Sequence, residues 1–274
     1  MIVSPALSGK RYAVLGLARS GMAVVRTLVG LRETNKFRSD RIDLVKLLRG
    51  SGELAAQYPD VWVQSHVAEN KHEIAWVSSL YPAARSYAAV YEQFGLLRRR
   101  SVYAHGIYLD DADRALFADT GASIAVSPTS NLFLGSGFFD YAKALQSPMR
   151  YGLASDVGGG TSLSPLTTMR AAYMSAREGV SKQAVTLAPS HLWWQHTAGA
   201  ALALGLMQSD GTPLVGNLAV GCEADFVVLN PAATPLLARR TKRAESPEAL
   251  LFALIILGDD RLVNSTHTSH PIAV

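Results

Sequence analysis

Strand-like and helix-like segments alternate between residues 60 and 179, and this alternation most constrains the fold. The apolar stretches typical of strands lie at 60–67, 101–106, 121–131 and 149–160. In the first, Trp62, Gln64 and His66 share one face of the strand. Helical patterns occupy 69–80, 84–95, 110–119, 136–146 and 165–179. Strand, helix and strand at this spacing predict βαβ units with a parallel sheet, and hence an α/β fold.

Polar residues end three of these strand-like segments. His66 lies near the end of the first, His105 near the end of the second, and Asp156 near the end of the last, within "ASDVGGG". The carboxyl ends of parallel strands are where (β/α)-barrel enzymes hold their catalytic groups. The pattern therefore makes these three residues candidates for a functional site.

Composition excludes several classes of protein. Apolar residues make up 49% of the 274 and charged residues 18%, which is typical of a compact fold rather than a disordered chain. The net charge of +4 comes largely from runs at 96–100 and 237–243. We interpret these runs as solvated helix ends and expect no nucleic-acid binding.

The single cysteine, Cys222, excludes an internal disulfide and any zinc site built from several cysteines. No apolar stretch reaches the roughly 18 residues of a membrane span, and the first residues lack a secretory pattern. These features predict a cytoplasmic protein with no membrane partner.

Five motifs resemble the guanine deaminase family of the amidohydrolase superfamily, in that family's order and spacing, over about residues 51–261. They are "QSHVAEN", "AHGIYLDD", "GASIAVSPTSNLFLGSGFFD", "DVGGGTS" and "LGDDR". The resemblance implies a metal-dependent (β/α)8 TIM-type barrel, of which residues 51–206 carry about the last four βα units. Residues 207–274 resemble a remnant of the family's small C-terminal β-subdomain, with a hairpin and a helix that follows Ser246 and Pro247.

The same resemblance implies the roles of four residues. His66 and Asp156 are similar to zinc ligands, and Asp156 also to the group that helps to deprotonate the attacking water. Glu69 resembles the acid/base that moves protons to the purine, and His105 resembles the histidine that contacts the water. The implied reaction is zinc-dependent hydrolysis of guanine to xanthine and ammonia, which suits the chemistry of a carboxylate and a neutral imidazole beside Zn²⁺. No substrate-binding residue is assigned.

Each of these residues also has a purely structural interpretation. Glu69 would favour the helix dipole if it stood in the first turn of a helix at 69–80. Asp156 would be a turn residue that bonds the backbone. We interpret the remaining histidines as surface or packing residues; they are His72, His191, His196, His267 and His270.

One expected feature of a barrel deaminase is missing from the sequence. The family's H-x-H pair, which supplies two zinc ligands, occurs nowhere among the seven histidines. A catalytic zinc site has three or more protein ligands, and this chain offers His66 and Asp156, with His105 as a candidate third. Barrel strands one to four are also not found. We therefore expect impaired activity, or alternatively a non-catalytic half-barrel that self-associates, as a homodimer.

Residues 1–50 form a separate extension in this interpretation. "KRYAVLGLARSG" predicts a strand at 12–15 and a helix at 20–29, and it resembles the start of the D-glutamate-adding ligase of peptidoglycan synthesis over about 30 residues. Gly16 and Gly21 would allow a phosphate to approach the backbone. A nucleotide-binding module is thus a third hypothesis, although no P-loop sequence follows. Residues 31–50 predict a polar connector and a short helix.

Overall fold

The computed structural model describes residues 12–14, 44–180 and 184–269. Strand β1 (Tyr12–Val14) agrees with the strand predicted at 12–15, whereas the helix predicted at 20–29 lies outside the described residues. Helix α2 (Leu44–Gln57) is longer than the short helix expected and continues past residue 50.

The larger sheet has five strands, hydrogen-bonded in the order β1-β2-β3-β4-β5. Strand β1 is parallel to β2 (Trp62–Val67), and β2 is parallel to β3 (Ser101–His105). Strands β4 (Ser123–Val126) and β5 (Arg150–Leu153) complete it. The α/β fold with a parallel sheet is therefore confirmed, while its description as part of a barrel stays a prediction.

Helices separate the strands, with bounds that differ from the predicted ones. They are α3 (Lys71–Leu80), α4 (Tyr87–Gln93), α5 (Asp111–Thr120), α6 (Pro128–Phe133), α7 (Tyr141–Gln146) and α8 (Pro165–Glu178). The region predicted as a strand at 121–131 is wrong beyond Val126, because Pro128 stands at the first position of α6, where its missing N–H costs nothing. The helix predicted at 136–146 begins only at Tyr141.

The chain divides into two compact units, each of which is described by itself. Among the described residues, unit 2 runs to Ile124 and includes Ser147–Arg150, and unit 1 holds Ala125–Gln146 and the residues from Tyr151 onward. The three-part division expected from the sequence stays a prediction.

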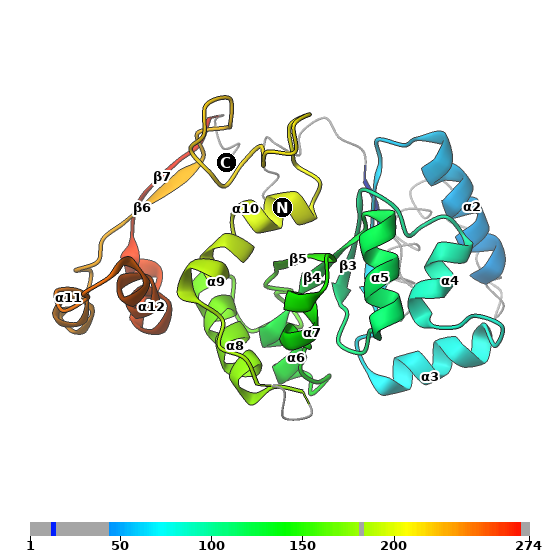
Figure 1. Ribbon diagram of the computed structural model, residues 1–274, viewed down its shortest axis with the longest axis horizontal. Helices are drawn as coiled ribbons and strands as arrows, with labels where there is room; N and C mark the ends of the chain where they lie inside the picture. The colour runs from blue at the N-terminus through cyan, green and yellow to red at the C-terminus, as the bar shows by residue number, and fades with distance from the viewer. Residues whose placement is uncertain (1–11, 15–43, 181–183, 270–274) are drawn as a thin grey trace, which may run out of the picture. The chain divides into compact units, whose positions relative to one another are not determined.

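An aromatic cluster forms the core of unit 2. Tyr91 of α4 lies with its ring centroid 4.6 Å from that of Tyr103 on β3, and Tyr103 meets Phe117 of α5 edge-on at 5.8 Å. All three side chains are fully buried or nearly so. Figure 1 shows α4 and α5 beside the strand that carries Tyr103. The cluster packs these two helices against β3.

Helices α8, α9 (Pro189–Gln195) and α12 (Pro247–Leu257) pack together in unit 1, with α11 (Pro235–Thr241) against α12 (Figure 1). The C-terminal end of α12 is closed by Arg170 of α8, whose guanidinium donates to the carbonyl oxygens of Ile255 and Gly258. The structure thus gives Arg170 a packing contact. Short helices α10 (Ala198–Ala203) and η2 (Asp260–Leu262) complete the set of described helices.

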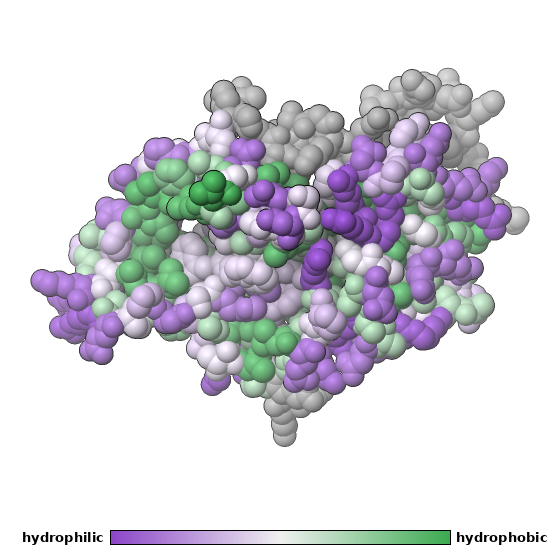
Figure 2. Space-filling view, turned by 45° about the horizontal axis from the view of Figure 1, so that its top comes forward, coloured by the Kyte–Doolittle hydropathy of each residue, from purple (hydrophilic) through white to green (hydrophobic). Residues whose placement is uncertain are grey.

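A two-stranded antiparallel ribbon, β6 (Phe226–Leu229) with β7 (Val263–His267), also belongs to unit 1. The apolar run Phe226–Leu229 is typical of a buried strand. In the structure, however, Phe226, Val227 and Val228 are exposed, because no further sheet covers them within the described residues. Leu218 and Val220 in the preceding loop are exposed as well. Figure 2 shows hydrophobic residues gathered on the surface of this part of the chain. No helix of the described residues is long and apolar enough to cross a bilayer.

Candidate functional site

Parallel pairing brings His66 and His105 together in unit 2. Strand register sets His66 opposite Ala104, and Val67 opposite His105, at the carboxyl ends of β2 and β3. The two imidazole rings stack with centroids 5.3 Å apart and planes 21° from parallel. His105 is buried and His66 is half-buried, so one ring of the pair is sheltered while the other reaches solvent.

Glu69 completes this group. Its Oε2 atom lies 3.8 Å from His105 Nε2, and its side chain is 18% exposed. Helix α3 begins at Lys71 with Asn70 as its N-cap, so Glu69 precedes the helix. The interpretation of Glu69 as an acid in the first turn is therefore wrong, because Asn70 Oδ1 accepts from Glu73 N–H and starts the helix two residues later than predicted. The sequence predicted three residues that the structure brings into one site.

Asp156 follows β5 in unit 1, which is the other compact unit. It is half-buried, and its carbonyl oxygen accepts from the N–H groups of Gly159 and Gly160. An added Cβ at Gly159 would lie 3.0 Å from the Asp156 carboxylate and 2.8 Å from Ser130 Oγ, so a side chain at this position would push against both groups. Asp156 thus sits in a tight turn closed by its main-chain carbonyl. The bond from its side chain to the backbone, which its structural interpretation expects, stays a prediction, as does its role in metal binding.

Two of the predicted residues, and the residue before a third, have left-handed backbone conformations. Among the described residues, the non-glycine positions with positive φ are Ala68 (48°), Arg100 (68°), His105 (73°) and Asp156 (46°). Two of these are predicted site residues, and Ala68 lies next to Glu69. Such conformations are uncommon outside glycine and cluster at functional sites, where the surrounding structure holds them. The backbone is therefore strained at His105 and Asp156, and at Ala68 next to Glu69.

Side chains of α3 and α4 form hydrogen bonds with the backbone of His66 and Glu69. Tyr91 Oη donates to the carbonyl oxygen of His66 at 2.9 Å and lies 2.7 Å from Ser65 Oγ. Glu73 of α3 is buried, which raises the pKa of its carboxyl, and its Oε2 accepts from Glu69 N–H at 3.1 Å. Sequence reasoning missed both residues. The spacing of Asn70 and Glu73, typical of a capped helix start, was the available signal for Glu73.

The described residues include the types of side chain that bind zinc, but not enough of them in one place. Imidazole nitrogens and carboxylate oxygens are ligands of zinc, and His66 and His105 are neighbours. Within residues 12–14, 44–180 and 184–269, however, no group of three or more histidine, cysteine, aspartate or glutamate side chains could hold a metal ion. A catalytic zinc needs three protein ligands. The described residues therefore do not provide a complete ligand set.

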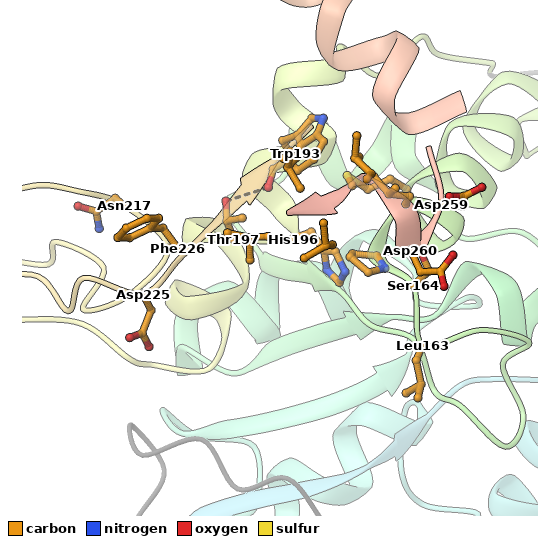
Figure 3. Close-up of a pocket in the computed structure, with 18 of the residues that line it drawn as sticks. Leu163, Ser164, Trp193, His196, Thr197, Asn217, Asp225, Phe226, Asp259 and Asp260 are labelled. Carbon is orange, nitrogen blue, oxygen red and sulfur yellow. Dashed lines mark hydrogen bonds between the residues drawn. The ribbon is translucent and has the colours of Figure 1, made fainter. Parts of the chain in front are cut away.

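A separate cavity of about 710 Å³ lies within unit 1 (Figure 3). Its walls are mainly apolar and come from α8, α9 and the β6–β7 ribbon, with Trp193, Phe226 and Leu163 among them. Carboxylates of Asp225, Asp259 and Asp260 also line it. None of the four predicted site residues is among the described residues that line this cavity. We therefore do not assign the predicted chemistry to it.

Two half-buried histidines of unit 1, His191 and His196, predict a loss of stability in acid. Burial lowers the pKa of His191 and of His196 from the ordinary value of 6.5. The unfolded chain then binds more protons than the folded one, so the free energy of unfolding falls as the pH drops below 6.5. Urea unfolding at a series of pH values measures this slope. The slope decreases in His196→Gln and is unchanged in His72→Gln, an exposed control; an equal slope in His196→Gln would contradict the assignment.

Comparison with known proteins identifies the family of the chain. The model of the amidohydrolase family matches residues 23–261. The chain is similar to guanine deaminase from Escherichia coli, with 41% identity over 214 residues (78% of this chain and 47% of that protein), and to human guanine deaminase, with 36% identity over 225 residues (79% and 48%). It spans about half the length of these curated relatives.

Solved structures show the same similarity. The E. coli guanine deaminase structure superposes with a TM-score of 0.76 at 39% identity, covering 83% of this chain and 51% of that one. Guanine deaminase from C. acetobutylicum, with guanine bound in its active site, gives 0.70 at 27% identity, covering 82% and 51%. A zinc complex of atrazine chlorohydrolase from Arthrobacter aurescens shares the fold, with a TM-score of 0.69 at 20% identity, covering 95% and 60%. By its family match, this chain belongs to the amidohydrolase family.

Proposed function

We propose that the chain carries the C-terminal half of a guanine deaminase centre and hydrolyses guanine to xanthine and ammonia. The observation that carries this proposal is the group formed by His66, Glu69 and His105 at the carboxyl ends of two parallel strands. The similarity to guanine deaminases, one of them a structure with guanine bound, supports the choice of substrate.

Each residue has one task in this reaction. Glu69 gives a proton to a ring nitrogen of guanine, takes a proton from the attacking water, and passes that proton to the departing amino group, which leaves as ammonia. His105, held 3.8 Å from the Glu69 carboxylate, contacts the water that attacks C2 of the purine. A general acid and a residue that contacts the water must lie within reach of one reacting centre, and the short separation of Glu69 and His105 supports this proposal.

His66 and Asp156 are proposed as two ligands of a zinc ion. When bound, zinc supplies Lewis acidity that lowers the pKa of water. Since the described residues provide no complete ligand set and the sequence has no H-x-H pair, we propose turnover slower than that of the similar E. coli enzyme. Zinc-containing relatives of the same fold support the choice of metal.

A substrate panel tests the proposed chemistry. Purified protein with added zinc is incubated with guanine, adenine and cytosine, and the products are separated by chromatography. We expect xanthine from guanine, and at least about a hundredfold less deamination of adenine, because its reactive amino group is at C6 rather than C2. Equal deamination of adenine would show a deaminase of a different substrate class. The E. coli enzyme, run alongside, gives the reference rate.

A second function is favoured by the open larger sheet. Its described strands end at β1 and β5, and an unpaired strand edge is a template for pairing with another chain. The alternative is therefore a non-catalytic half-barrel that forms a homodimer. Light scattering gives the mass in solution. A dimer that makes no xanthine would favour this alternative, whereas a monomer that makes xanthine would exclude it.

A further inference from the structure

Glu73 is a buried carboxylate that the proposed reaction does not use. It lies on α3 and is 8% exposed. A carboxylate removed from water is costly unless its oxygens accept hydrogen bonds. Here Oε2 accepts from Glu69 N–H at 3.1 Å, and Oε1 accepts from Tyr87 Oη at 3.1 Å. Both oxygens are therefore engaged, and one of them holds the backbone of the proposed acid/base.

The backbone around Glu69 needs such a contact. Ala68 before it has a φ of 48°, and Asn70 after it is the N-cap of α3. Glu69 thus joins a left-handed residue to a helix start, outside the regular hydrogen bonds of either β2 or α3. Buried backbone N–H groups are paired in folded proteins. The Glu69 N–H donates to the Glu73 carboxylate, which lies one turn into the helix.

Tyr87 and Tyr91 of α4 support the site at two points, one near Glu69 and the other at His66. Tyr87 donates to Glu73, and Tyr91 donates to the carbonyl oxygen of His66. The two rings stack on the same helix, α4, with centroids 5.5 Å apart. One helix therefore fixes the backbone on either side of residues 67 and 68.

We propose that Glu73, supported by Tyr87, is a positioning residue: it fixes the Glu69 main chain and so keeps the Glu69 carboxylate beside His105. The inference rests on the proposed function for its effect on catalysis. The hydrogen bond from the Glu69 amide to Glu73 can be tested without any measurement of turnover. Displacing a reacting group by about 1 Å costs roughly a hundredfold in rate, so a hold of this kind matters to the chemical step.

Hydrogen exchange of the Glu69 amide, followed by NMR on the full chain, tests the hold. In Glu73→Ala the amide loses a charge-assisted bond, and we expect exchange roughly tenfold to a hundredfold faster. Glu73→Gln keeps a side-chain oxygen for the Glu69 N–H and restores most of the protection. Glu92→Ala, an exposed position on α4, is the matched control and leaves the Glu69 amide unchanged.

Tyr87→Phe is a second variant that tests the same hydrogen bond if Glu73→Ala does not fold. It removes only the hydroxyl that orients the carboxylate, and we expect the Glu69 amide to exchange about threefold to tenfold faster. The proposal is overturned if the Glu69 amide of Glu73→Ala exchanges within about twofold of the wild-type rate. If Glu73→Ala does not fold, the same result in Tyr87→Phe overturns it. The reason is that a hydrogen bond that orders the amide must slow its opening.

Guanine turnover separates positioning from general stability. We expect kcat in Glu73→Ala to fall by about tenfold to a hundredfold with KM for guanine nearly unchanged, and Glu73→Gln to recover most of kcat. A loss that Gln does not recover, or one that appears only in KM, would contradict a positioning role. If wild-type protein makes no xanthine, the proposed function fails, while amide exchange still decides whether Glu73 holds Glu69.

Discussion

Glu69→Gln is expected to lower kcat for xanthine formation by about 10²–10⁴-fold, the range that general acid–base catalysis contributes. Glutamine has nearly the same size, so the backbone contact from Glu73 and the neighbouring His105 ring remain in place. It cannot carry a proton between water and the purine. Steady-state absorbance at a series of guanine concentrations gives kcat and KM.

The control for Glu69→Gln is Glu92→Gln, which makes the same change at an exposed position of the same unit. It should leave kcat unchanged. A kcat in Glu69→Gln within about threefold of wild type would remove Glu69 from the proton-transfer role, since losing a general acid has a larger effect than this.

Phe117→Ala is expected to lower the free energy of unfolding by about 3–5 kcal/mol. Phe117 is fully buried, and its ring meets Tyr103 edge-on, so truncation removes apolar burial and leaves a cavity beside β3. Urea unfolding followed by fluorescence gives the difference. Leu54→Ala, at a half-exposed leucine of α2, should change the free energy by less than about 1 kcal/mol. Equal losses in both variants would contradict the aromatic core of unit 2.

The alternation of residue types in the sequence predicted strand β2 of the larger sheet, and the burial of its side chains follows this alternation from Val63 onward. Val63, Ser65 and Val67 are buried, whereas Gln64 and His66 on the other face are half-buried; Trp62, also on that face, is buried. The position of His66 and His105 at neighbouring strand ends followed from parallel pairing alone. This part of the site was accessible from sequence since it depends on local pattern and chain order.

Side-chain contacts between elements were beyond the sequence. The bond from Glu73 to Glu69 depends on where Asn70 starts α3, and a helix boundary is set by one cap residue that periodicity does not locate. The pattern at 121–131 predicts a strand that continues through "SPTSN", but Pro128 begins α6. The exposure of Phe226 likewise depends on which sheet covers a strand, which its apolar composition does not reveal.

Zinc-dependent conversion of guanine to xanthine by the purified chain tests the central claim most directly. Chelator-treated protein is assayed before and after zinc is restored, with absorbance and released ammonia measured together. His66→Ala, prepared identically, controls for a deaminase carried over from the expression host, because E. coli has one of its own. The account predicts equal xanthine and ammonia, dependent on zinc and lost in His66→Ala. No xanthine from the zinc-loaded wild type, or the same amount from His66→Ala, would contradict it.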